Sequence, residues 1–455
     1  MIWLVFIVIK KNMSLKIPIE LLSSEAREKI IKDLTININS KKNTFQSKSY
    51  QPKSSFIEVY DINDTNTIIS LPFAYCLNEL VPMCNVPVSK PSYDQYKKIC
   101  DDCTFIGSLR EEQKSIKEEA ITNLNQTGAC LISAYPGFGK TCTSIYITSK
   151  IKLQTVIIIN RIVLMNQWEE AIRKFCPNAN IVCVKPNTPS KRQKQSDFSP
   201  DYIIVNAVNI PKIGQEMFKN VGVVIVDEAH LIMSQVLSQG LFYIFPKYII
   251  GLSATPYRID GLDALMTLYF TDKKIIRNLH RNHTVYRVDT GFTPEVEYDR
   301  NGKVIWSKIL EQQCLNQQRN ALILDIVQKH PTRFFLVLSK RTEQAQYLYD
   351  CLLERNENVS LLIGSNTTFN KEARVLIGTS SKIGVGFDHS KMDALILASD
   401  LEQYFIQYLG RVFRTEEVEP LIFDLVDNNN ILKKHFATRR SVYTQAGGKI
   451  VKYSI

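Results

Sequence analysis

The chain has 455 residues, of which 45% are hydrophobic and 22% are charged, as in ordinary soluble globular proteins, and this length accommodates about two or three domains. An excess of 56 Lys and Arg over 45 Asp and Glu gives a net charge of +11, which fits a polyanionic partner because phosphate backbones release counterions to basic side chains. The 10 cysteines are scattered along the chain, which excludes a disulfide framework and indicates reduced thiols in an intracellular protein.

The N-terminal residues 1–9 are apolar and are followed by Lys10 and Lys11. A bilayer span needs about 20 residues, and this run lacks the basic leader and the small-residue cleavage site of a secretory signal. We interpret it as a buried strand, or as residues upstream of a working initiator at Met13. No other stretch approaches membrane length, so we expect an intracellular, soluble protein that binds no membrane.

Residues 1–104 are interpreted as a small accessory region that is partly linker. Ser24 is predicted to cap a helix over residues 25–34, where apolar side chains recur at helical spacing. Residues 40–55 are rich in Ser, Lys, Asn and Gln and are typical of an exposed linker. Short runs of β-type residues follow, such as residues 67–71.

One CxxC pair, Cys100 and Cys103, lies at the end of this region. Together with Cys76 and Cys84 it could complete a four-sulfur zinc site, but those upstream spacings match no common zinc pattern. We therefore do not expect zinc.

From Leu109 onward, apolar runs of strand length alternate with helix-length segments. Continuous Ile/Val-rich runs of this kind are typical of parallel strands that are buried on both faces and joined by crossover helices. The first series comprises residues 129–133, 155–159, 202–205, 221–226 and 248–252. The second series comprises residues 334–338, 359–363, 375–377, 394–397 and 421–425. The sequence therefore predicts an α/β fold of two doubly wound domains, divided between residues 280 and 315.

A phosphate-binding loop is predicted between the strand that ends at Ser133 and a helix that opens at Lys140. Its residues are Ala134, Tyr135, Pro136, Gly137, Phe138, Gly139, Lys140 and Thr141. Gly137 and Gly139 let backbone N–H groups turn toward the phosphates of ATP, and the helix N-terminus adds the positive end of its dipole. Lys140 is expected to contact the β- and γ-phosphates, and the Thr141 hydroxyl to ligate magnesium.

Two acidic residues, Asp227 and Glu228, directly follow the apolar run 221–226. They lie at the carboxyl end of a predicted strand, where open α/β sheets bind ligands. Asp227 is expected to hold the magnesium ion, and Glu228 to act as the base that orients the attacking water. Paired with the phosphate-binding loop, these acids predict hydrolysis of a nucleoside triphosphate.

A polar turn, Ser253-Ala254-Thr255, follows another predicted strand. The hydroxyls of Ser253 and Thr255 could bridge to Asp227 or to His230 and pass the state of the nucleotide onward. An ordinary polar turn after a strand is the alternative.

Gln407, Arg411 and Arg414 fall on one face of a predicted helix, because they are four and three residues apart. Arginines so placed suit charge stabilisation on a transferring γ-phosphoryl group, which is the role of an arginine finger. A basic stripe on the surface is the alternative. Since this helix belongs to the second α/β domain and the phosphate-binding loop to the first, the finger role is favoured.

Six runs stand in the order of the motifs of superfamily 2 helicases: residues 134–141, 164–168, 227–230, 253–255, 378–388 and 407–414. The chain resembles this superfamily over about residues 105–445. It is most similar to DEAH-type helicases of the XPB-like branch, and in particular to the transcript-release helicases of large DNA viruses. Two runs that carry this likeness are GLSATPYRIDG at 251–261 and IGTSSKIGVGFD at 377–388.

The resemblance implies two tandem RecA-like domains that close on ATP, over residues 105–285 and 286–455, after the accessory region. It also implies nucleotide contacts beyond the phosphate-binding loop, from Gln113 near the adenine and from Gly386 and Asp388 in the second domain. Contacts to the nucleic-acid backbone are implied for Arg161, Gln167, Thr379 and Ser380.

The leading hypothesis is an ATP-dependent DNA helicase or translocase that acts in viral transcription or DNA remodelling, with ATP and magnesium as cofactors. An RNA helicase is the first alternative. The second is an ATP-dependent clamp or binding subunit of a transcription complex with little unwinding. Nucleic acid, DNA before RNA, is the expected partner, together with RNA polymerase or transcription factors. Such a protein is expected in the cytoplasm or nucleus or, if viral, at the replication site or in the virion.

Overall fold

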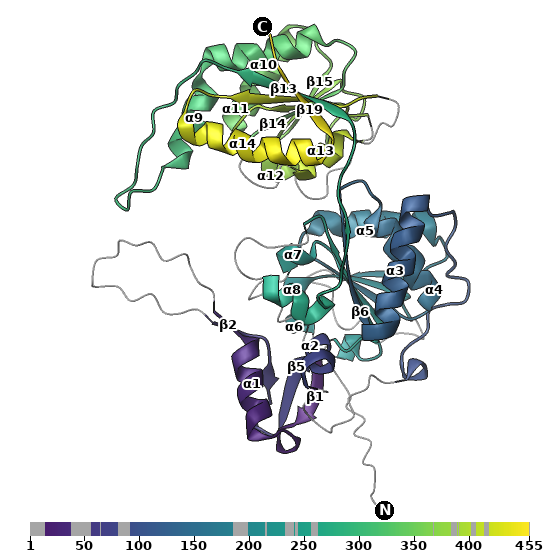
Figure 1. Cartoon of the computed structure of the whole chain (residues 1–455). Helices are drawn as coiled ribbons and strands as arrows, with labels where there is room; N and C mark the ends of the chain where they lie inside the picture. The colour runs from purple at the N-terminus through teal and green to yellow at the C-terminus, as the bar shows by residue number, and fades with distance from the viewer. Residues whose placement is uncertain are drawn as a thin grey trace, which may run out of the picture. The chain divides into compact units, whose positions relative to one another are not determined.

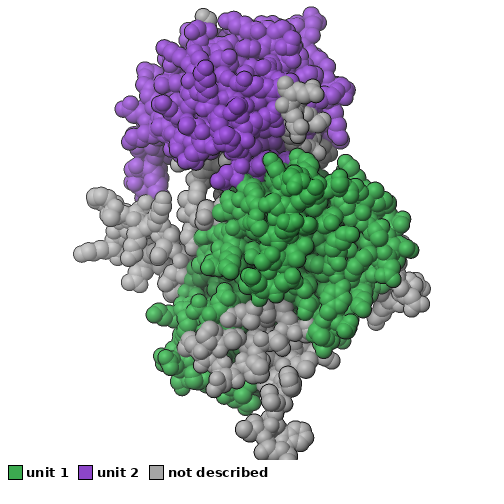
Figure 2. All heavy atoms as spheres, turned by 45° about the vertical axis from the view of Figure 1, so that its right-hand side comes forward, with its two compact units in different colours: residues 1–134, 138–277 green, residues 135–137, 278–455 purple. Residues whose placement is uncertain are grey.

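The computed structural model describes most of the chain in two compact units. The described residues are 14–37, 56–63, 65–80, 92–184, 199–213, 216–232, 241, 244–255, 263–366, 368–383, 389, 391–401, 406–413 and 418–454. The first unit comprises residues 1–134 and 138–277, and the second comprises residues 135–137 and 278–455 (Figure 2). Residues 1–9 and the predicted linker 40–55 lie outside the described residues.

The boundary between the units falls at residues 277 and 278, before the predicted boundary at 285. Residue 285 lies inside strand β13 (His283–Asp289). This strand pairs in parallel with β18 (Leu421–Val426) and β19 (Gly448–Lys452). A division at 285 would cut a strand that belongs wholly to the second sheet.

The first unit is built on a sheet of seven parallel strands. Their order across the sheet is β12 (Lys274–Arg277), β6 (Ala129–Ala134), β11 (Tyr248–Ser253), β10 (Val223–Val226), β7 (Thr155–Ile159), β9 (Tyr202–Asn206) and β8 (Ile181–Val184). All five strands of the first predicted series are present. The two that sequence missed, β8 and β12, lie at the edges, where most of their side chains are only half-buried. Both strands have only four residues. β12 begins with Lys274 and ends with Arg277, whereas β8 is apolar throughout but short.

Helices cover both faces of this sheet, with α3 and α4 on one side and α7 and α8 on the other (Figure 1). The helices of this α/β core are α3 (Glu111–Thr127), α4 (Lys140–Ile151), α5 (Ile162–Phe175), α6 (Ile210–Ile213), α7 (Ala229–Ile232) and α8 (Asp263–Phe270). Short 3-10 turns lie at Tyr93–Gln95, Ala207–Asn209 and Glu216–Phe218. This alternation of strand and helix gives the doubly wound arrangement that the sequence predicted.

The accessory region forms a small α/β layer of its own. Its elements are β1 (Ser14–Pro18), a 3-10 turn (Ile19–Leu21), α1 (Ser24–Leu34), β2 (Thr35–Asn37), β3 (Phe56–Glu58), β4 (Asp61–Ile62), β5 (Ile68–Pro72), α2 (Phe73–Tyr75) and a π-helical turn (Cys76–Leu80). Strands β1, β5 and β4 pair antiparallel, as do β2 and β3. The cap of α1 is Ser23, not Ser24, because the Ser23 hydroxyl accepts from the N–H of Ala26 at 3.1 Å.

This region shares a hydrophobic core with the first sheet. Ala26 and Ile30 of α1 belong to the same cluster of buried side chains as Leu131 of β6, Val156 of β7 and Phe270 of α8. The predicted accessory region therefore exists as a layer of secondary structure, but it is part of the first compact unit.

The second unit is built on another sheet of seven parallel strands. Their order is β15 (Val359–Leu362), β16 (Val375–Thr379), β14 (Phe335–Ser339), β17 (Ala394–Leu397), β18, β13 and β19. Its helices are α9 (Trp306–Leu315), α10 (Gln317–Lys329), α11 (Thr342–Glu354), α12 (Ser380–Ile383), α13 (Ile406–Val412) and α14 (Asn430–Gln445). All five strands of the second predicted series are present, and the predicted fold class of two tandem α/β domains is confirmed.

Two further expectations concern membranes and zinc. Among the helices that the structure describes, none is both long and apolar enough to span a bilayer. Within the described ranges, no group of three or more His, Cys, Asp or Glu side chains is arranged to hold a metal ion. Cys84, one of the four cysteines considered for zinc, lies outside those ranges.

Candidate active site

The predicted site residues that follow the strands of the first sheet gather at the carboxyl edge of that sheet. Strands β6, β11, β10 and β7 are consecutive neighbours and all run parallel. Their carboxyl ends therefore lie side by side, where open α/β sheets bind ligands. In sheet order, these ends lead into the loop 134–141, the turn 253–255, the acids at 227–228, and Arg161.

The phosphate-binding loop has the backbone that a nest of N–H groups requires. Gly137 and Gly139 have φ of +87° and +94°, values that L-residues with a side chain rarely adopt. Gly139 is the N-cap of α4. The Lys140 Nζ donates to the carbonyl of Ala134 at 2.6 Å across the loop. The remaining loop residues, Tyr135, Pro136 and Phe138, span the turn between β6 and α4, and Thr141 lies partly exposed in the first turn of α4.

Gln113 holds this loop from the side. Its side chain is 3% exposed, and its amide donates to the carbonyl of Phe138 at 3.1 Å. Its oxygen accepts from the N–H of Arg110 at 2.9 Å, and the Arg110 side chain also donates to the Phe138 carbonyl. A Cβ on Gly139 would come within 2.3 Å of the Gln113 amide nitrogen. The structure thus brings Gln113 to the phosphate-binding loop, and a contact with adenine stays a prediction.

The acidic pair lies directly beyond β10. Asp227 accepts hydrogen bonds on both carboxylate oxygens, from the N–H of Glu228 at 2.9 Å and from the indole of Trp168 at 2.8 Å. Burial, with the neighbouring Glu228 carboxylate, raises the pKa of Asp227 to about 6, while Trp168 and Lys140 oppose that rise. Asp227 is therefore ionised at neutral pH and takes up a proton as the pH falls through 6.

Glu228 has a left-handed backbone conformation, with φ of +47°. A residue with a side chain adopts this region only at a cost, and such strain clusters at functional sites. His230 and Ser253 join the acids to the neighbouring strand end, because the His230 Nδ1 and the Ser253 hydroxyl lie 2.9 Å apart and His230 lies 3.5 Å from a Glu228 oxygen. The predicted bridge from Ser253 to His230 is thus present.

The Ser253 side chain holds the turn that follows it. The Ser253 hydroxyl donates to the carbonyl of Thr255 at 2.5 Å and accepts from the Thr255 N–H at 3.0 Å, with Ala254 between them. The Thr255 hydroxyl itself contacts no hydrogen-bond partner among the described residues. Thr255 therefore contributes its backbone, where the sequence had predicted a bridging hydroxyl.

The side chains and backbone groups at this edge fit magnesium and a triphosphate. A carboxylate and a hydroxyl, from Asp227 and Thr141, are the oxygen ligands that Mg²⁺ takes together with substrate phosphates. Phosphates need a positive environment. It is supplied by the backbone N–H groups that the left-handed Gly137 and Gly139 can orient, by the N-terminus of α4 and by the Lys140 ammonium.

In the second unit, the predicted residues lie on α12, on α13 and at the end of β16. Thr379 ends β16 and Ser380 begins α12. The Tyr408 hydroxyl on α13 donates to the Ser380 carbonyl at 2.9 Å, which ties the two helices together. Gln407 and Arg411 both lie on α13, the first buried and the second half-buried. Gly386, Asp388 and Arg414 lie outside the described residues.

The predicted nucleic-acid contacts of the first unit lie at one end of α5. Arg161 is its N-cap and is exposed, while Gln167 is half-buried two turns further along. In the second unit, Thr379 is buried and Ser380 is half-buried. The contacts of all four residues with nucleic acid stay predictions.

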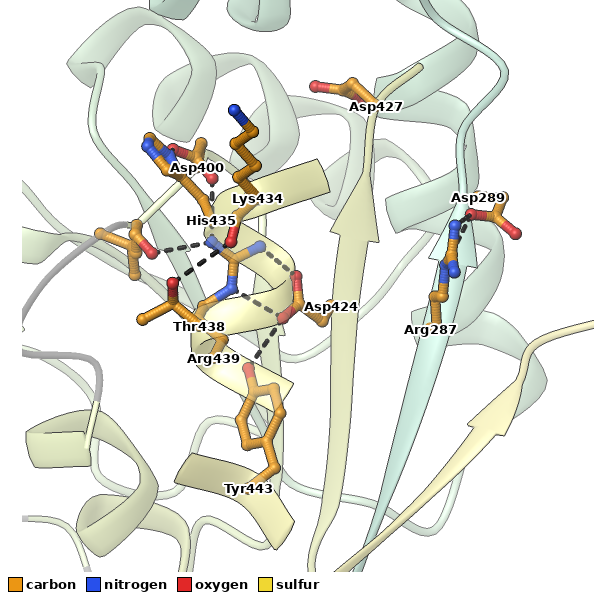
Figure 3. A network of polar contacts seen from close by, with 12 residues as sticks. Arg287, Asp289, Asp400, Asp424, Asp427, Lys434, His435, Thr438, Arg439 and Tyr443 are labelled. Atoms are coloured by element: carbon orange, nitrogen blue, oxygen red, sulfur yellow. Dashed lines mark hydrogen bonds and ion pairs between the residues drawn. The ribbon is translucent and has the colours of Figure 1, made fainter. Parts of the chain in front are cut away.

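A buried polar network supports the segment that leads into α13 (Figure 3). Arg439 of α14 is 1% exposed and makes two 2.8 Å hydrogen bonds to the Asp424 carboxylate of β18. It also donates to Asp400 at 2.9 Å and to the Leu401 carbonyl at 2.8 Å. Burial works against ionisation of Asp400, but His435, 2.6 Å away, and Arg439 hold the pKa of that carboxyl below its usual range.

We expect Arg439→Met to lower the free energy of unfolding of the protein by about 3–5 kcal/mol, because the change leaves the buried Asp424 carboxylate without its cation and removes a hydrogen-bond donor from Asp400. Arg440→Met changes an exposed residue of the same helix and should shift stability by less than about 0.5 kcal/mol. Urea unfolding of both variants measures the difference. Equal stabilities would show that the network does not hold this unit together.

Sequence reasoning missed the residues of this network, although one signal was present. Asp424 is a lone charge inside the apolar run Leu421–Val426, and a charge at a buried strand position requires a partner.

Trp168 lies in the motif run 164–168, but no role was predicted for it from the sequence. Its place on the buried stripe of α5 was predictable, whereas its hydrogen bond to Asp227 depends on the sheet order.

Comparisons with known proteins show the family of this chain. The family "Type III restriction enzyme, res subunit" matches residues 106–258, the part that contains the loop and the acids. The protein 161L of Invertebrate iridescent virus 6, whose name describes a helicase, is 44% identical over 371 residues, which are 77% of this chain and 84% of the relative. The chain is a superfamily 2 helicase.

Two further proteins are similar to this chain, one in sequence and one in fold. A protein of Acanthamoeba polyphaga mimivirus, whose name describes an ATP-dependent RNA helicase, is 26% identical over 96% of this chain and 85% of the relative. The structure of S. cerevisiae Dbp5 bound to RNA and ADP BeF3 matches with a TM-score of 0.53 at 14% identity, over 74% of this chain and 89% of Dbp5. This likeness supports the tandem RecA-like fold. As a member of the family, the helicase is an ATP-dependent enzyme, which confirms that prediction.

Proposed function

We propose that this helicase is an ATP-driven DNA translocase or helicase of the DEAH-type, XPB-like branch, and that it serves transcription or DNA remodelling in a large DNA virus. The observation that carries the motor function is the meeting of the phosphate-binding loop, Asp227 and Glu228 at the carboxyl edge of one sheet. The net charge of +11 supports a polyanionic partner. The motif runs at 251–261 and 377–388 support the branch, and the viral relative supports the setting.

In the first unit, each site residue has a separate task in hydrolysis. The backbone N–H groups of the loop and Lys140 bind the phosphates, and Thr141 and Asp227 hold magnesium, which neutralises charge on the phosphates when bound. Glu228 orients the attacking water and accepts its proton. His230 lies between Glu228 and Ser253, so a change at the acid reaches the turn 253–255 through that contact.

In the second unit, Arg411 and Arg414 stabilise the charge that develops on the transferring γ-phosphoryl group, and Gln407 lies on α13 with Arg411. Gly386 and Asp388 complete the nucleotide contacts of this unit. Arg161, Gln167, Thr379 and Ser380 contact the nucleic-acid backbone. Such contacts depend on charge and not on base sequence, so they can form at any position along a strand. Successive closures of the nucleotide site would therefore move the protein along it.

RNA is the second candidate polymer. It is favoured by the mimivirus relative, whose name describes an ATP-dependent RNA helicase. RNA polymerase or a transcription factor is the protein partner that a role in transcription would require.

Steady-state ATP hydrolysis with different polymers separates these functions. The rate is measured without polymer and with single-stranded DNA, duplex DNA or RNA, each at 50 mM and 200 mM salt. We expect DNA to raise the rate at least about tenfold at the lower salt, with a smaller increase at the higher salt because phosphate contacts are screened. Stimulation by RNA alone would favour the RNA helicase. A rate that no polymer changes would favour the clamp.

A further inference from the structure

Helix α5 presents one apolar stripe to the interior of the first unit. Leu164, Met165, Trp168 and Ile172 recur at helical spacing and are all buried. Trp168 is the largest of them and is 1% exposed. A buried indole carries a single N–H donor, which must find an acceptor or lose the free energy of its hydrogen bond to water.

The acceptor that Trp168 finds is the proposed magnesium ligand. Its Nε1–H donates to Asp227 Oδ2 at 2.8 Å, while the Glu228 N–H donates to Asp227 Oδ1 at 2.9 Å. A carboxylate offers about four lone-pair positions, so each oxygen keeps one position for a cation. The two hydrogen bonds together fix the rotation of the carboxylate group.

The same helix begins at a residue that the proposed function assigns to nucleic acid. Arg161 is the exposed N-cap of α5, and Ile162 and Val163 in the first turn are 65% and 46% exposed. Two helical turns separate Arg161 from Trp168. A shift of α5 along its axis would therefore move the indole N–H relative to Asp227.

We propose that Trp168 is a positioning residue, whose indole N–H orients Asp227 for magnesium and links the nucleic-acid end of α5 to the metal ligand. An apolar ring system of the same shape would satisfy packing alone, whereas a charge-assisted bond to a ligand carboxylate needs the N–H. This inference rests on the proposed role of Asp227 as a magnesium ligand.

The test measures metal affinity directly. Mn²⁺ is titrated into the full-length protein with ADP, and free Mn²⁺ is followed by electron paramagnetic resonance. We expect Trp168→Phe to weaken Mn²⁺ binding about tenfold, the usual effect of losing a group that orients a metal ligand. ATP turnover at saturating Mg²⁺ should change less than the Mg²⁺ concentration required for half the maximal rate.

Two control variants separate orientation from packing. Met165→Leu alters the same buried stripe at nearly constant volume, so it should leave Mn²⁺ affinity unchanged. Benzothienylalanine at position 168 keeps the shape of Trp but lacks the N–H, so it should weaken Mn²⁺ binding as Phe does. If the benzothienylalanine variant binds Mn²⁺ as the wild type does, this inference is wrong and the proposed function stands, whatever the Phe variant does. If the wild type binds no Mn²⁺ with ADP, the magnesium site itself is wrong.

Discussion

Glu228→Gln is expected to reduce the turnover number for ATP by at least about 100-fold, the lower part of the range for loss of a positioned general base. Gln keeps the size of Glu but cannot accept the proton of the attacking water. The left-handed backbone at this position, with φ of +47°, does not depend on the carboxylate. The groups that bind the phosphates, Lys140 and the loop N–H groups, are unchanged.

The measurement pairs steady-state turnover with equilibrium binding of a fluorescent ATP analogue. Affinity for the analogue should stay within about threefold of wild type, because the groups that bind the phosphates are unchanged. A threefold change in affinity corresponds to about 0.65 kcal/mol. Glu112→Gln, an exposed acid of α3, is the matched control and should retain full turnover. If the Glu228 variant hydrolyses ATP as fast as this control, the base has been assigned to the wrong residue.

Arg411→Ala is expected to lower turnover by about 1,000-fold or more, which is the contribution of an arginine finger in related phosphoryl transfers. The loss should appear in the transition state and not in the ground state. We therefore expect the variant to bind ADP as the wild type does, and to bind ADP with aluminium fluoride, a mimic of the transferring phosphoryl group, much more weakly.

Arg440→Ala removes an exposed arginine from α14 of the same unit and serves as the control for loss of a positive charge. It should leave both turnover and binding of the aluminium fluoride complex intact. Equal activity of Arg411→Ala and Arg440→Ala would support the alternative that was weighed from the sequence, a basic stripe on the surface of α13.

The central strands and the backbone of the phosphate-binding loop could be predicted from the sequence because local patterns specify them. The run Thr155–Ile159 is apolar at every position, since β7 is buried on both faces. The phosphate-binding loop needs Gly137 and Gly139 for its backbone, so its pattern survives in the sequence itself. The edge strands β8 and β12 are harder to recognise, because each has only four residues and β12 begins and ends with a charged side chain.

Contacts between segments far apart in the chain were beyond prediction. Trp168 meets Asp227 only because β7, which precedes α5, lies beside β10 in the sheet. The boundary at 277 was missed for a similar reason, since β13 joins the second sheet through pairing with strands more than 100 residues later. The shared core between α1 and the first sheet likewise depends on the folded chain.

Displacement of streptavidin from biotinylated DNA tests most directly whether hydrolysis at this site drives movement. Single-stranded and duplex DNA, each with a biotin at one end, are incubated with the wild-type protein or Glu228→Gln. We predict that the wild type removes streptavidin only when ATP is present and hydrolysed, and that the variant binds the same DNA but removes none. Displacement by Glu228→Gln at the wild-type rate, or DNA-stimulated hydrolysis by the wild type with no displacement from either end of any substrate, would contradict it.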